Sequence, residues 1–168
     1  GTYAIEQGTL AVVGLNYTMS FVSNDFTITG KPITVTADAG QTKVFGSTDP
    51  VAFTYVSSDL GAIFTGALNR AVGENAGTYA IGQGTLSAGA NYDITFVPSN
   101  FTITAKPITV TADSGQTKVF GSADPVAFTY ASSDLGASFT GALNRAVGEN
   151  VGAYAIGQGT LSAGTNYA

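Results

Sequence analysis

A repeat of 75 residues limits what this chain can fold into more than any other feature of its sequence. Residues 31–92 recur at 106–167 with seven differences among 62 positions. Residues 1–30 match 77–105, the end of the same repeat, with one extra residue near Val13. Self-similarity at a fixed period indicates one structural unit used several times. We therefore expect a tandem array of one small domain, in which such close copies imply recent duplication.

The repeat divides the chain into three parts. Residues 1–30 are the C-terminal part of one copy, residues 31–105 are a complete copy, and residues 106–168 are a copy that lacks its last strands. A copy that lacks its last strands exposes a sheet edge and half of its core. The exposed edge is a template for strand pairing. In a longer array, the residues that follow would fill this edge. In a polymer, residues 18–30 of a neighbouring chain would fill it by strand addition.

Hydrophobic and polar residues alternate along the repeat with the period of a β-strand rather than a helix. Ile33 and Val35, for example, are separated by Thr34 and followed by Thr36. The strands that we expect in the complete copy are 32–37, 42–45, 51–56, 64–70, 78–81, 91–97 and 100–105. Seven short strands with regular turn signals predict an all-β fold, with a small immunoglobulin-like β-sandwich in each repeat. The one candidate helix, at 62–72, is interrupted by glycines, and we expect no helix there.

The glycine-rich stretch 77–86 also occurs at 1–10 and 152–161, and each occurrence has a Tyr two residues after a Gly. In the complete copy this Tyr is Tyr79. It resembles the tyrosine corner of immunoglobulin-like domains, where the hydroxyl bonds to the backbone a few residues upstream. The alternative is a tyrosine that packs in a strand with its hydroxyl in water. We expect the corner, with Gly82 and Gly84 as breaks before the closing strands.

The junction between the two later copies has no flexible linker. Residues 101–112 run from the last strand of one copy into the first strand of the next without a Gly/Ser segment. Pro107 fixes its own φ and restricts the preceding residue to extended geometry. We therefore expect neighbouring domains to be held stiffly.

Several motifs of the repeat, taken together, resemble those of the MBG ("mostly bacterial glycine-rich") domain family of the Tyr-Gly type, and the resemblance covers the whole chain. The motifs are Lys-Pro-Ile-Thr-Val-Thr-Ala, Lys-Val-Phe-Gly, Phe-Thr-Gly-Ala-Leu-Asn-Arg, Gly-Glu-Asn-x-Gly-x-Tyr-Ala-Ile, Gly-Thr-Leu and Phe-Thr-Ile-Thr. The family's Tyr-Gly appears here as Phe45-Gly46 and Phe120-Gly121, which keeps the aromatic ring and loses the hydroxyl. The resemblance implies tandem arrays in large bacterial extracellular proteins, often adhesin-like. It implies no catalytic residues.

The chain lacks the residue types on which most active sites depend. It has no histidine and no cysteine, which excludes Ser/His/Asp and Cys/His catalysis, disulfides and thiolate metal sites. The six basic residues are scattered singly and the net charge is −5, so we expect no nucleic-acid partner. No apolar run approaches the length of a membrane-spanning helix. We predict no enzyme, no catalytic or metal-binding residues, no cofactor and no membrane insertion of this segment.

Three acidic residues, Asp49, Asp59 and Glu74, lie in expected loops and recur in the next copy. Acids repeated in every module of an array are more often structural than catalytic. Calcium held by such acids at inter-domain loops is an alternative, although it needs clustered carboxylates and these are dispersed in sequence.

Two further hypotheses concern the basic residues of the complete copy. Lys43, Asn69 and Glu74 are candidates for an internal Lys–Asn isopeptide cross-link with an assisting acid. Arg70 and Glu74 are expected to form an exposed ion pair that contributes at most about 1 kcal/mol, or to bond turn carbonyls.

The sequence favours a structural, non-enzymatic repeat of an extracellular, cell-surface or secreted bacterial protein, in which stiffly joined domains project a distal region from the cell. Its expected partners are the adjacent repeats of the same protein. One alternative is a filament subunit, a homopolymer joined head to tail by strand exchange. The other is a weak, multivalent module that binds glycan or protein through repeated loops. Both ends of the sequence fall inside the repeat, so we expect a segment of a longer array or one unit of a polymer.

Overall fold

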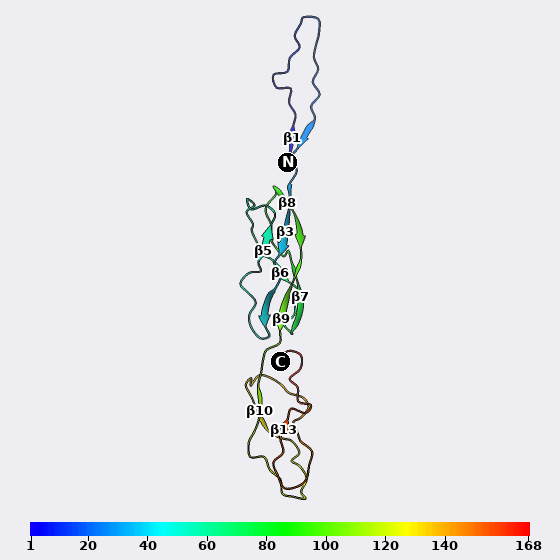
Figure 1. Ribbon diagram of the computed structural model, residues 1–168. Coiled ribbons are helices and arrows are strands. Elements are labelled where there is room, and N and C mark those ends of the chain that lie inside the picture. The colour runs from blue at the N-terminus through cyan, green and yellow to red at the C-terminus, as the bar shows by residue number, and fades with distance from the viewer.

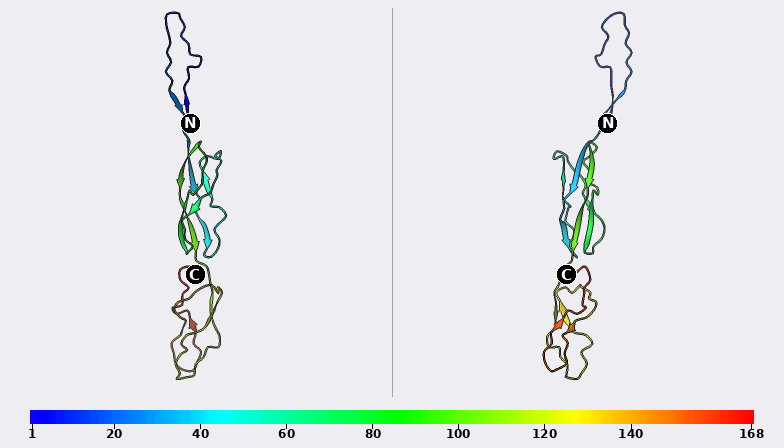
Figure 2. Two further views of the ribbon diagram at one scale, coloured as in Figure 1. Left: turned by 180° about the vertical axis from the view of Figure 1, so that it is seen from behind. Right: turned by 45° about the vertical axis from the view of Figure 1, so that its right-hand side comes forward.

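The computed structural model describes residues 1–168, which form three parts arranged in line (Figures 1 and 2). An N-terminal hairpin arm leads into a compact complete repeat, and a more open third repeat follows it. The structure has thirteen strands and no helix, so the predicted all-β fold is confirmed and the segment 62–72 is not helical. No helix is available that could cross a membrane.

The first sheet of the complete repeat has three strands in the order β5-β3-β8. The central strand β3 (Lys31–Ala37) pairs antiparallel with β5 (Tyr55–Ser57) and parallel with β8 (Tyr92–Val97). The inward-facing residues of β3 alternate with its threonines, as its period predicts. The first sheet therefore turns one apolar face to the interior.

The second sheet has four strands in the order β4-β9-β7-β6. They are β4 (Gln41–Val44), β9 (Ser99–Thr104), β7 (Gly77–Gly82) and β6 (Asn69–Arg70). β9 pairs parallel with β4 and antiparallel with β7. Two of the expected strands, 51–56 and 64–70, are mostly irregular and form ladders only at their ends.

The chain crosses from the first sheet to the second three times, between β3 and β4, between β5 and β6 and between β8 and β9. The last of these crossings occurs at Pro98, which has no N–H to offer to a ladder. The start of the repeat and its end consequently lie side by side in both sheets, as parallel pairs β3·β8 and β4·β9. The segment β8–β9 closes both sheets at once. The likeness of this topology to immunoglobulin domains stays a prediction.

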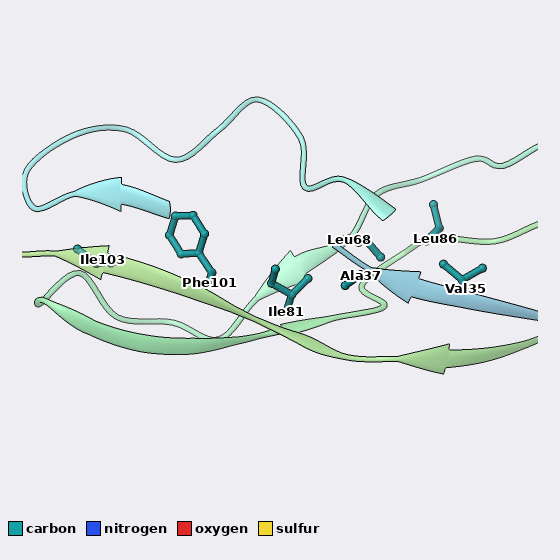
Figure 3. Packing of buried hydrophobic residues seen from close by; sticks show 7 residues of the cluster. All are labelled: Val35, Ala37, Leu68, Ile81, Leu86, Phe101 and Ile103. Carbon is teal, nitrogen blue, oxygen red and sulfur yellow. The ribbon is translucent and has the colours of Figure 1, made fainter. Parts of the chain in front are cut away.

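The core of the complete repeat lies between the two sheets, with side chains from both interdigitating (Figure 3). Its seven buried residues are Val35, Ala37, Leu68, Ile81, Leu86, Phe101 and Ile103. Phe101 of β9 is fully buried and meets the ring of Phe53 edge to face, with centroids 5.3 Å apart. Burying side chains of this size contributes about 1.5–3 kcal/mol each, so β9 supplies much of the stabilisation of the repeat.

The N-terminal arm is a long hairpin in which β1 (Thr2–Ala4) pairs antiparallel with β2 (Asp25–Thr27). Tyr3 lies opposite Phe26, as Tyr79 lies opposite Phe101 in the complete repeat. The arm thus has the register of the β7–β9 pair without the other strands, and its residues are exposed to solvent.

The third repeat keeps only short fragments of the two sheets. Its strands are β10 (Val110–Ala112), β11 (Tyr130–Ser132), β12 (Asn144–Arg145) and β13 (Ile156–Gly157). Their pairs β10·β11 and β12·β13 repeat β3·β5 and β6·β7. No strand stands at the place of β8 and β9, because residues 106–168 correspond to 31–93.

Candidate interface between repeats

The complete repeat and the third repeat meet at a joint formed by residues far apart in sequence. β9 continues through a single residue, Ala105, to Lys106, whose N–H donates to the carbonyl of Asn166 at 2.9 Å. Lys106 and Tyr167 form a parallel bridge, and the Ala168 N–H donates to the Lys106 carbonyl at 3.0 Å. The loop 164–168 is thereby held against the start of its own repeat, next to the end of the preceding one (Figure 1).

The side chain of Asn166 connects the two repeats through two hydrogen bonds. Its Oδ1 accepts from the backbone N–H of Ala76 at 2.7 Å, and its Nδ2 donates to Oδ1 of Asn75 at 2.9 Å. An amide carries both a donor and an acceptor, so one side chain satisfies both partners. The equivalent residue of the complete repeat, Asn91, is exposed, and its side chain makes no such bond.

An aromatic pair completes the joint. Tyr167 of the third repeat meets Phe45 of the complete repeat edge to face, with ring centroids 5.5 Å apart. Such pairs contribute about 0.5–1.5 kcal/mol beyond the area that they bury. Phe45 belongs to the Phe45-Gly46 motif, so this motif supplies a contact to the following repeat. Its counterpart Phe120 in the third repeat is 69% exposed.

A cluster of charged side chains supports the turn that faces Asn166. Arg70 binds Asp49 through two nitrogens, at 2.7 and 3.0 Å, and also pairs with Glu74. A third nitrogen of Arg70 donates to the carbonyls of Ala71 at 3.0 Å and Gly73 at 2.6 Å. Because Glu74 directly precedes Asn75, this cluster fixes the backbone that donates to Asn166.

The pKa values within the cluster follow from these contacts. Hydrogen bonds from Arg70 and from Lys43 lower the pKa of the Asp49 carboxyl to about 2. Lys43 and Arg70 in the same way lower the pKa of Glu74, and hydrogen bonds to Asp49 and Glu74 raise the pKa of Lys43. All four groups are therefore charged at neutral pH.

The hypotheses about the basic residues are partly wrong. Arg70 makes both the ion pair and the carbonyl bonds, but its side chain is only 7% exposed and Asp49 is an additional partner. The Nζ of Lys43 lies 2.6 Å from Asp49 and next to Glu74, and it has no hydrogen bond to Asn69. Amide formation needs an uncharged amine, whereas these carboxylates keep Lys43 charged. The geometry is that of an ion-pair cluster, not of an isopeptide site.

The tyrosine corner is present in both later repeats. The hydroxyl of Tyr79 donates to the carbonyl of Asn75 at 2.8 Å, and that of Tyr154 donates to Asn150 at 2.9 Å. The glycine that this corner requires is Gly73, where φ is +143° and a Cβ would overlap the ring of Tyr79. Gly77, two residues before the tyrosine, faces no such contact. The turn 73–76 is therefore held at two points: Arg70 of the charged cluster donates to the carbonyl of Gly73, and Tyr79 donates to the carbonyl of Asn75.

The acidic residues considered for calcium are each paired with a cation. Asp59 accepts a hydrogen bond from Lys31 at 2.6 Å, and Asp49 and Glu74 share Lys43 and Arg70. No three acidic side chains gather in a geometry that could hold a metal ion. These acidic residues form ion pairs within their own repeat.

The comparisons with known proteins agree with the repeat pattern. The model of the MBG domain (YGX type) family matches twice, at residues 33–102 and 108–168. The chain belongs to the MBG domain (YGX type) family. This is a family of structural repeats found in surface proteins, and it is not a known enzyme family. No curated protein and no solved structure is similar enough to match the chain.

Sequence reasoning missed the three residues that form the joint as a set. Asn166 and Tyr167 stand in an ordinary polar loop, and Phe45 looks like a core aromatic. One signal was available: the dipeptide Asn-Tyr recurs at 16–17, 91–92 and 166–167. A polar amide kept beside an aromatic residue in every copy signals a shared role, and in this structure Asn166 and Tyr167 are the copy that forms the contact.

Proposed function

We propose that this chain is a spacer segment of an extracellular bacterial surface protein, in which stiffly joined MBG repeats hold a distal region away from the cell. The joint between the second and third repeats is the observation that carries this proposal. A spacer needs resistance to bending more than it needs a ligand site. Two hydrogen bonds, one aromatic pair and a one-residue connection supply such resistance.

The stiffness of the joint depends on the number of constraints between the two repeats. A flexible linker leaves domains free to reorient. Here the covalent connection at Ala105 lies on one side of the joint, and the contacts of Asn166 and Tyr167 provide further points of attachment. Attachment at several separate points opposes bending and also opposes rotation about the long axis.

The experiment measures distances between the two repeats. Because the chain contains no cysteine, Leu60→Cys and Leu135→Cys introduce single spin-label sites at equivalent positions that are each 97% exposed. We expect one narrow distance distribution for this double variant. Adding Asn166→Ala or Tyr167→Ala should broaden it severalfold.

Asn91→Ala is the matched control, since it removes the same side chain from the equivalent loop without touching the joint. It should leave the distribution unchanged. A broad distribution in the parent double variant, or no response to Asn166→Ala and Tyr167→Ala, would contradict the proposed stiffness and with it the spacer function.

A further inference from the structure

β8 forms one edge of the first sheet of the complete repeat, and no strand pairs with its outer side. It runs along the outer margin of that repeat (Figure 1). β8 is six residues long, whereas the other edge strands, β4, β5 and β6, have four, three and two residues. Short length, lysine side chains and proline are common protections of an edge against pairing. β8 is long, and it contains no Lys, Arg or Pro.

The backbone groups on the outer side of β8 are free to pair with a further strand. In a parallel ladder, alternate residues turn their N–H and carbonyl groups toward the partner strand. The Lys31 N–H donates to the Asn91 carbonyl at 2.8 Å, so within β8 the groups of Thr95 face β3. The groups of Ile94 and Phe96 face away from β3, and none of the hydrogen bonds outside the ladders uses them.

The side chains of Ile94 and Phe96 are also incompletely covered. Both pack against the core but are only partly buried, whereas Ile33 and Val35 of the central strand are 3% and 0% exposed. A strand added beside β8 would cover these two side chains and would pair the backbone groups next to them. The edge therefore fits an extended strand with apolar residues at alternate positions.

We propose that β8 of one copy of this chain pairs antiparallel with β8 of a second copy, with the two Ile94 residues opposite each other. β8 is complementary to itself in this register. On the inner face, Tyr92 lies opposite Phe96 of the second copy. On the outer face, Asp93 lies opposite Thr95 of the second copy. Apolar residues therefore meet apolar residues, no like charges are opposed, and each copy contributes three strands to one continuous sheet.

This pairing has a two-fold axis, because both copies use the same surface. All of the residues that take part lie within the complete repeat, away from the joint that Asn166 and Tyr167 form. The inference is therefore independent of the spacer function. In an array, a β8 edge in each complete repeat would provide several weak lateral contacts that act together.

Sedimentation equilibrium of the full chain over a range of concentrations measures this association. We expect a monomer–dimer equilibrium that reaches twice the chain mass of 16.9 kDa and does not grow further. Thr95→Asp places a carboxylate opposite Asp93 of the second copy at two sites in the dimer, so it should weaken dimerisation about tenfold. Thr95→Lys places an opposite charge there, and it should strengthen dimerisation about threefold.

Thr78→Asp is the matched control. Thr78 is exposed on the central strand β7 of the other sheet, so this variant carries the same added charge away from β8. It should dimerise like the parent chain. Hydrogen exchange supplies a second measurement: the amides of Ile94 and Phe96 should become protected on dimerisation, whereas that of Thr95, already bonded to β3, should change little.

A chain that stays monomeric at every concentration would overturn the inference and leave this edge to a strand of another protein. Masses that grow beyond two chains would contradict the two-fold pairing. Equal effects of Thr95→Asp and Thr78→Asp, or weaker association of Thr95→Lys, would contradict the proposed register. The spin-label distances of the spacer test are measured within single chains at low concentration, so the two experiments can succeed or fail separately.

Discussion

The complete repeat and the third repeat have nearly the same sequence over the residues that they share, and yet they differ in internal order. Nine of the ten buried residues of the molecule lie in the complete repeat, and only Leu161 lies in the third. The local features survive in both: the tyrosine corner, the arginine cluster and the hairpin pairs recur with nearly the same distances. The difference lies in β8 and β9.

This comparison separates local from cooperative stabilisation. Turns, corners and ion pairs involve only residues that both repeats contain, so they form in either repeat. The ladders of both sheets and the burial of the core depend on the last two strands. β8 pairs with β3, and β9 pairs with both β4 and β7, so these strands connect the start of the repeat to its end. The repeat is therefore one cooperative unit closed by its final segment.

The largest expected effect comes from truncating that segment. Phe101→Ala should destabilise the complete repeat by about 3–5 kcal/mol, since it leaves a cavity at the centre of the core. Hydrogen exchange at β7 and β9 should then approach the rate seen in the third repeat. Phe26→Ala, the same change in the exposed arm, should cost about 0.5 kcal/mol or less. Equal costs at the two positions would contradict the central role of β9.

Removing the buried arginine should have the next largest effect. Arg70→Met keeps most of the apolar stem but leaves two carbonyls without a donor and Asp49 with Lys43 as its remaining cation, so we expect a loss of about 2–3 kcal/mol in the free energy of unfolding. Arg145→Met should cost less. The Arg70 guanidinium lies over the rings of Tyr79 and Phe101, whereas Arg145 lies over a single ring. Urea unfolding of the two variants compares them directly.

The tyrosine corner should respond equally in both repeats. Tyr79→Phe and Tyr154→Phe each keep the ring and remove one hydroxyl hydrogen bond, which corresponds to about 1 kcal/mol. Local hydrogen exchange around the turns 73–76 and 148–151 measures the cost in each repeat. A variant with no change would show that the tyrosine contributes through packing alone.

Acid should have the smallest effect. Because the folded-state pKa of Asp49 is about 2, below its ordinary value of 3.8, the ionised carboxylate stabilises the fold at neutral pH. This contribution is lost as the pH falls from about 5 through 2. Asp49 is more than one third exposed, so solvent screening limits the loss to about 1 kcal/mol or less. Asp49→Asn should remove this part of the pH dependence in thermal unfolding.

The fold class and the periodic features could be predicted from the sequence because they depend on local pattern. Alternation gave β3 and β9, and the repeated Gly-x-Tyr gave the corner. The shortening of the strands at 51–56 and 64–70 could not be predicted, since their alternation continues where no partner strand is available. The joint was also missed, because the contact of Asn166 with Asn75 depends on how two copies are stacked.

The parallel pairing of the start and the end of the complete repeat has a mechanical consequence. Tension along the array pulls Lys31 and Thr104 in opposite directions, along strands that lie side by side. The hydrogen bonds of both parallel ladders are then loaded together in shear, instead of opening one after another from an end. Force spectroscopy on the chain should record a high unfolding force for the complete repeat and a lower one for the third, where these ladders are missing.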